Sequence, residues 1–70
     1  MEIEYGAEVR DKNGKVLGTV NKVIRDSWTG EISKFQVSTE LSELDLFVSP
    51  ENVAEATPSE VKLTIAFDEI

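Results

Sequence analysis

The chain contains no cysteine and no histidine among its 70 residues. Without cysteine there are no disulfides, no thiolate nucleophiles and no sulfur ligands for a metal, and without histidine the most common general base is missing. A chain this short buries only about 60% of the surface that its unfolded form exposes, so we expect no large substrate pocket. These absences predict one non-enzymatic domain, residues 1–70, that uses no cofactor.

Basic side chains are half as numerous as acidic ones, seven against fourteen, and the net charge is −7. Residues 1–35 carry six charges of each sign, whereas from residue 36 onward one lysine opposes eight acidic side chains. We interpret this second region as a solvated acidic rim, which repels phosphate backbones and predicts no nucleic-acid binding. Five basic residues of the first region could form a positive stripe, but acidic residues interleave with them and base-stacking aromatic residues do not. These five are Arg10, Lys15, Lys22, Arg25 and Lys34.

Long hydrophobic runs are also lacking. No segment approaches the roughly 18 consecutive apolar residues that a transmembrane helix needs. Residues 1–5 (MEIEY) are acidic where a secretory signal would be basic and then apolar. The sequence therefore predicts no membrane insertion, and we expect a cytoplasmic location, with which the absence of cysteine is compatible.

What the sequence does contain is a repeated alternation of apolar and polar residues, broken at short intervals by turn residues. This period of two is typical of an all-β barrel or sandwich. The Asn13-Gly14 pair is the strongest hairpin signal, and residues 26–30 (DSWTG) predict a second turn. We therefore expect a small β-barrel of five or six mostly antiparallel strands. The expected strands are residues 5–10, 16–25, 32–39, 44–48 and 61–67.

Two segments depart from simple alternation. The 16–25 run includes three apolar residues spaced three apart, which a helix could use, but Gly18 and the β-branched residues around it favour a strand bent by a bulge at Gly18 or its neighbour. Ser49 followed by Pro50 predicts a short helix of one or two turns, because the second proline follows eight residues later. The expected core residues are Leu17, Val20, Phe35, Val37, Leu46, Val61, Leu63, Ile65 and Phe67.

Several short segments match a known family pattern. They are residues 6–11 (GAEVRD), 13–15 (NGK), 17–20 (LGTV), 23–26 (VIRD), 29–32 (TGEI) and 47–53 (FVSPENV). Together they resemble the PRC-barrel domain, the small β-barrel of the photosynthetic reaction centre H subunit and of the C-terminal half of the ribosome maturation factor family. The resemblance implies a stand-alone PRC barrel, and its motifs are structural rather than catalytic.

The acidic residues offer no convincing metal site. Glu40, Glu43 and Asp45 could in principle hold a hard cation, but such a loop in an acidic protein is usually solvated. Residues 11–14 begin like a calcium loop, yet the glycine comes two positions early and Lys22 stands where a bidentate glutamate is needed. We therefore expect no metal.

Two aromatic residues are candidate contacts for another protein. Trp28 lies at a predicted hairpin tip, where it either folds back over the barrel end or anchors a partner. Phe47 shares the outer face of its strand with Asp45 and Ser49, an unusual place for a phenyl ring unless something covers it. Trp28 and Phe47 are therefore the predicted interaction residues.

Two functions remain open from the sequence. The first is a protein-interaction or assembly module that forms a homodimer through Phe47 and Trp28, because the small core has no disulfide or metal to stabilise it and a short barrel leaves strand edges open. The second, implied by the family resemblance alone, is a factor associated with ribosomes or RNA processing.

Overall fold

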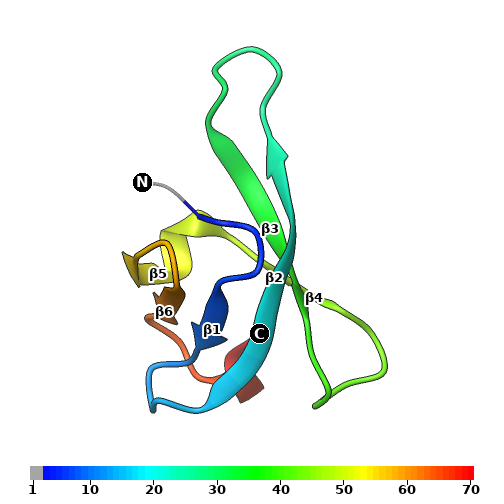
Figure 1. Ribbon diagram of the computed structural model, residues 1–70, viewed down its shortest axis with the longest axis vertical. Coiled ribbons are helices and arrows are strands. Elements are labelled where there is room, and N and C mark those ends of the chain that lie inside the picture. The colour runs from blue at the N-terminus through cyan, green and yellow to red at the C-terminus, as the bar shows by residue number, and fades with distance from the viewer. Residues whose placement is uncertain (1–2) are drawn as a thin grey trace.

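Six β-strands form one curled sheet in the computed structural model, which describes residues 3–70 (Figure 1). The strands are β1 (Glu8–Arg10), β2 (Val16–Arg25), β3 (Ile32–Ser38), β4 (Leu46–Val48), β5 (Val53–Ala56) and β6 (Glu60–Leu63). Their order across the sheet is β4-β3-β2-β1-β6-β5, and only the β1–β6 pair is parallel. The predicted all-β, barrel-like class is thus confirmed. Among residues 3–70 there is no helix with the length and hydrophobicity of a transmembrane span.

The first hairpin turn joins β1 to β2 and is built around Asp11. The Asp11 carbonyl accepts the N–H of Gly14 at 3.0 Å, and its own N–H donates to the Lys15 carbonyl at 2.9 Å. Gly14 has a φ of +82°, whereas Asn13 has a negative φ, so one left-handed residue is enough for this turn. The Asn-Gly signal therefore located the hairpin correctly, although the type I′ turn that Asn-Gly favours would need a positive φ at both central residues.

The pairing of β2 is interrupted beside Gly18, as expected. Val9 pairs with Gly18 and Arg10 pairs with Val16, so Leu17 is the unpaired residue of a bulge. Gly18 lies directly against the neighbouring strand, where a Cβ would collide with the Ser38 carbonyl group. The bulge beside Gly18 is confirmed, and a second one follows at Asn21, between the β3 partners Val37 and Gln36.

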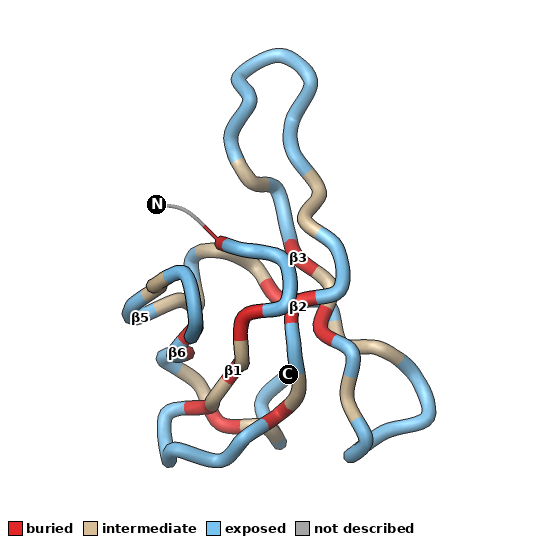
Figure 2. The backbone as a smooth tube through the Cα atoms, viewed as in Figure 1, coloured by how far each residue is buried: buried red, intermediate tan, exposed pale blue. Residues whose placement is uncertain are grey.

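The core lies below the projecting part of the β2–β3 hairpin, in the middle and lower parts of the molecule (Figure 2). Its buried residues are Ile3, Ala7, Val9, Leu17, Val20, Phe35, Val37, Val48, Val61 and Leu63. Of the expected core residues, Leu46, Ile65 and Phe67 are only partly buried and pack against its margin. The upper part of the β2–β3 hairpin contains no buried residue.

The segment after Ser49 is shorter and more varied than expected. Ser49 caps a single 3-10 turn, η1 (Pro50–Asn52), by accepting the N–H of Glu51 at 3.3 Å. The sequence then forms β5, a strand that the proline-based interpretation missed. β5 pairs with β6 and has no fully buried residue. Its sequence therefore lacks the alternation of apolar and polar residues by which the other strands were predicted.

The last predicted strand, residues 61–67, is wrong in its second half. β6 ends at Leu63, the N–H of Thr64 donates to the Asn52 carbonyl at 2.8 Å, and the chain then turns into a second 3-10 turn, η2 (Phe67–Glu69). The turn is fixed by a contact from the other end of the chain, because the Phe67 N–H donates to the Asp11 carboxylate at 3.1 Å. Alternation alone could not reveal that contact.

Candidate functional site

The distal part of the β2–β3 hairpin projects from the body of the molecule (Figure 1). β4 reaches β3 only at residues 35–37, and β1 reaches β2 only at residues 16–19. Residues 24–34, which we call the arm, therefore form a two-stranded ribbon whose strands pair only with each other. The arm is the part of the described sheet that has no strand on either side.

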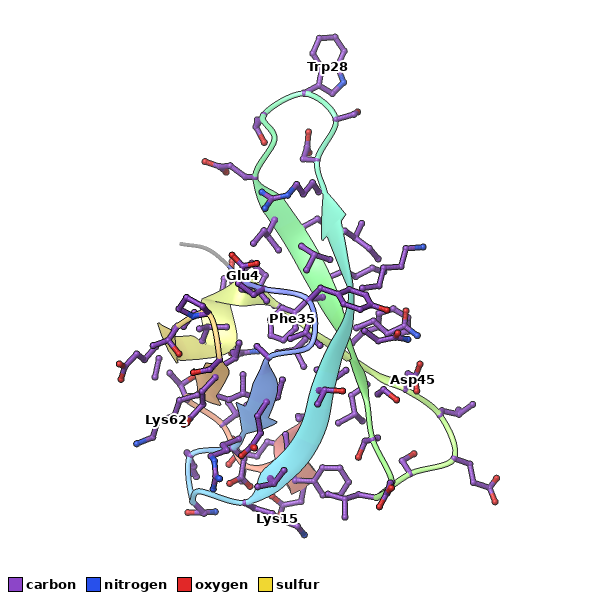
Figure 3. All side chains as sticks on the ribbon, viewed as in Figure 1. Glu4, Lys15, Trp28, Phe35, Asp45 and Lys62 are labelled. Carbon is purple, nitrogen blue, oxygen red and sulfur yellow. The ribbon has the colours of Figure 1, made fainter. Side chains whose placement is uncertain are left out.

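The tip of the arm is a hydrogen-bonded turn that presents Trp28. The Asp26 carboxylate accepts the N–H of Trp28 at 2.7 Å and that of Thr29 at 3.3 Å. The Gly30 N–H donates to the Asp26 carbonyl at 2.8 Å, and Gly30 has a φ of +74°. Trp28 points away from the body and is 95% exposed (Figure 3). The alternative that Trp28 folds back over the barrel end is therefore wrong.

The two faces of the arm differ in what they present. Ile24 pairs with Lys34, and these two side chains share the outer face. Arg25 pairs with Ile32 on the inner face, where Ile32 packs against the edge of the core. Both faces thus carry one isoleucine and one basic residue.

A half-open cleft runs along the arm, from residues beside the tip turn to η1 on the body. Its lining comes from the arm and from η1, its volume is about 380 Å³, and more of its wall is apolar than polar. The lining residues are Arg25, Gly30, Glu31, Ile32 and Pro50. The Arg25 guanidinium donates to the Gly30 carbonyl at 3.0 Å, which holds it along the wall of this arm cleft.

Phe47 occupies the outer face of β4, as the alternation predicts, and is 52% exposed. The Lys34 ammonium group lies over its ring at 4.9 Å from the centroid, a cation–π contact. Leu44, expected on the inner face, instead lies in the loop before β4 and is 78% exposed. The apolar surface at β4 therefore consists of Phe47 and Leu44, and the second of these was not predicted.

Trp28 and Phe47 do not form one surface. Trp28 lies at the tip of the arm, whereas β4 lies beside the part of β3 that joins the body (Figure 1). Tyr5 is a third exposed aromatic residue, at 75%, which the strand interpretation of residues 5–10 placed in a strand and the structure places in a turn before β1.

The charged residues considered as possible binding sites lie apart from one another, and several of them contact neighbouring side chains. Arg10 pairs with Glu8 at 2.6 Å, and Lys15 lies 5.2 Å from the centre of the Phe67 ring. Asp45 accepts the side-chain amide of Gln36 at 2.6 Å. Across residues 3–70, no three metal-ligating side chains gather into a site, and the acidic 40–45 loop is included in that description.

The carboxylate with the most contacts, Asp11, was not singled out as important by the sequence. It is 2% exposed and accepts N–H groups from Asn13, Lys15 and Phe67 at 2.9, 2.9 and 3.1 Å. Burial raises the pKa of Asp11, but these N–H groups outweigh burial and hold the pKa below the usual value of 3.8. An aspartate two residues before Asn-Gly is a signal for such a cap, and the role is structural.

No model of a known protein family matches the chain, and no curated protein matches it at a significant level.

Proposed function

We propose that this chain is a non-enzymatic protein-interaction module that forms a homodimer, with Trp28 and Phe47 in contact surfaces. The observation that carries the proposal is the exposure of these two large aromatic side chains, 95% and 52%, on a domain of 70 residues. Trp and Phe are enriched in the cores of protein interfaces, where their large apolar area is removed from water.

The open edges of the sheet support association. Among residues 3–70, the backbone of β4 bonds to no strand other than β3, and that of β5 to no strand other than β6. Natural proteins cover such edges or keep them short, because unpaired N–H and C=O groups can bond to another chain. β4 is three residues long and carries Phe47, so a partner covering this edge would bury the ring as well.

The polar groups support a binding role over catalysis. In the described residues, the two carboxyls with a clearly shifted pKa are Asp11 and Glu69, and both are shifted downward. The hydrogen bond with Lys12, at 3.0 Å, is the main cause of the lowered pKa of Glu69. A carboxyl that acts as a general acid near neutral pH works best with a pKa raised toward the working pH, whereas the pKa values of these two carboxyls are shifted the other way.

The dimer is tested by sedimentation velocity at tens of micromolar protein and moderate salt, which screens the charge of −7 on each copy. We expect a dimer for the wild type and weaker association for Trp28→Ser or Phe47→Ser. Tyr5→Ser, which removes an exposed aromatic residue outside both surfaces, is the matched control and should still dimerise. A wild-type monomer under these conditions contradicts the proposal.

The family resemblance leaves the ribosome- or RNA-associated factor as the alternative. The charge distribution favours the protein-interaction role, because several basic residues contact acidic or aromatic neighbours, as Arg10 does with Glu8 and Lys34 with Phe47. We expect no shift of a labelled oligonucleotide in a gel at physiological salt. Sub-micromolar binding that weakens with salt would favour the alternative.

A further inference from the structure

We propose that the arms of two copies of the chain pack against each other, with Trp28 of each copy seated in the arm cleft of the other. We call this arrangement arm exchange. The inference rests on the proposed self-association and specifies where the two copies touch. The arms lie antiparallel around a two-fold axis, so that the tip of each reaches the cleft of the other.

The arm has too few packing contacts to be stable by itself as a two-stranded ribbon. A two-stranded ribbon is at best marginally stable in water and needs a third strand or a packed face. Between Ile24 and Lys34 neither edge of the ribbon is paired by another strand, and no residue in this range is buried. An apolar residue on each face and a tryptophan at the tip are the features of a segment that packs against a partner.

The partner is a second copy because the arm carries both halves of the contact. Trp28 is at the tip, and the cleft runs along the arm from Gly30 and Glu31, next to the tip turn, to Ile32 and Pro50. Antiparallel arms that overlap along this stretch bring each Trp28 to the other cleft at once. Such self-complementarity is what a two-fold interface requires.

Charge also favours contact between arms over contact between bodies. The arm holds two basic and two acidic side chains and is neutral, whereas the other residues hold five basic and twelve acidic ones, a net charge of −7. Two copies that meet through their arms therefore avoid most of the mutual repulsion.

The arm cleft matches the chemistry of an indole ring. Its volume of about 380 Å³ lies within the range of about 300–1,000 Å³ typical of pockets that hold small organic groups. Ile32 and Pro50 supply apolar wall, and the Arg25 guanidinium lines the cleft while it is bonded to the Gly30 carbonyl, which adds a cation of the kind that attracts a tryptophan ring. The cleft has room for the side chain that the tip exposes.

Trp28 is the only tryptophan of the chain, so its fluorescence reports this contact directly. As the protein concentration rises through the monomer–dimer transition measured by sedimentation, we expect the emission to shift to the blue and acrylamide quenching to fall. A dimer whose tryptophan stays as accessible as in the monomer overturns arm exchange and leaves the proposed dimer intact. A monomer throughout overturns both.

Cysteine cross-linking gives a second test that leaves Trp28 in place, since the chain has no cysteine of its own. Ser27→Cys, at the tip, and Glu51→Cys, beside the cleft, are made in separate chains and mixed under mild oxidation. Both positions are exposed, so folding should be preserved. Arm exchange predicts that the mixed disulfide forms faster by about tenfold or more than in a control mixture of Ser27→Cys with Glu43→Cys.

Glu43 lies in the exposed loop before β4, away from the arm cleft, so it samples only random encounters. Intact-mass measurement separates the mixed disulfide from the two symmetric ones. Equal rates for the two mixtures, with a dimer present, would overturn arm exchange. Phe47→Ser should leave the preference for Glu51→Cys unchanged in whatever dimer remains.

Discussion

The two hairpin turns at the ends of β2 use the same local chemistry and end in different roles. In each, an aspartate side chain accepts backbone N–H groups from the next few residues, and a glycine with positive φ closes the turn. Asp11 bonds its N–H to Lys15 at 2.9 Å, and Asp26 bonds its N–H to Glu31 at 2.8 Å. Short-range sequence therefore fixes the shape of both turns.

Tertiary contacts separate them. The turn at Asp11 is held by the C-terminal segment, through the Phe67 N–H and through the Lys12 N–H, which donates to the Ile65 carbonyl at 3.0 Å. The hydrogen bonds of Asp26 all stay within its own turn. The first turn is part of the body, and the second is a support for Trp28. The contrast supports our proposal that Trp28, at the end of β2 that the rest of the described chain leaves uncovered, is a contact residue.

The largest expected effect is the loss of stability when Gly18, in β2 beside the body, is replaced, and it is compared with the loss at Gly30 in the tip turn. Gly18→Ala should destabilise the fold by about 3 kcal/mol or more, because the new Cβ meets the Ser38 backbone. Gly30→Ala meets nothing within 4 Å and should cost only about 1–2 kcal/mol for its left-handed backbone. Urea unfolding followed by circular dichroism measures both, and equal losses would mean that the arm is as tightly packed as the body.

The next comparison exchanges each turn aspartate for asparagine. Asp11 uses both carboxylate oxygens, one for Asn13 and Lys15 and the other for Phe67, so Asp11→Asn puts an amide N–H against a backbone N–H. Asp26 uses one oxygen alone, which the amide of Asp26→Asn retains. We expect a clear fall in Tm for Asp11→Asn and little change for Asp26→Asn. Similar Tm values for the two variants would contradict the assigned role of Phe67.

Acid should unfold the protein partly through the same carboxylate. The pKa of Asp11 is lower in the folded chain than its usual 3.8, so the stability it contributes is present above that pH and is lost as the pH falls toward the folded value. Glu69, held by Lys12, acts in the same direction. A Tm series through the acid range should therefore fall less steeply in Asp11→Asn than in the wild type. A parallel decline in both would assign the acid sensitivity to other groups.

Much of the fold could be predicted because it depends on neighbours in sequence. The turns at Asn13-Gly14 and residues 26–30, the bulge beside Gly18 and the cap at Ser49 each follow from the conformational preferences of a few adjacent residues. Phe47 was placed on the outer face for the same reason, since alternation within a strand is local. The family resemblance and the functions drawn from it stay predictions.

The remainder depended on contacts between distant residues. Ile65 and Phe67 continue the alternation of β6, but the bond to Asp11, 56 residues earlier, turns the chain into η2. Leu44 fits the inner pattern, yet it precedes the point where β4 begins to pair with β3. The arm cleft unites the β2–β3 hairpin with Pro50, so no single window of sequence contains it.

The smallest expected effect on folding belongs to Trp28, although it is the largest side chain of the protein. At 95% exposure it makes almost no packing contact within one copy, so Trp28→Ser should change the free energy of unfolding of the monomer by no more than about 0.5 kcal/mol. Phe67 is the matched aromatic residue at the other turn, and it packs against the core margin and Lys15. Phe67→Ser should cost about 1 kcal/mol or more. The comparison is made by urea unfolding at concentrations below the dimer transition, where a loss for Trp28→Ser equal to that for Phe67→Ser would show that the arm folds back in solution. If instead the loss for Trp28→Ser emerges only as the concentration rises, the stability that this side chain supplies belongs to the dimer, because binding to the native state alone stabilises it by mass action.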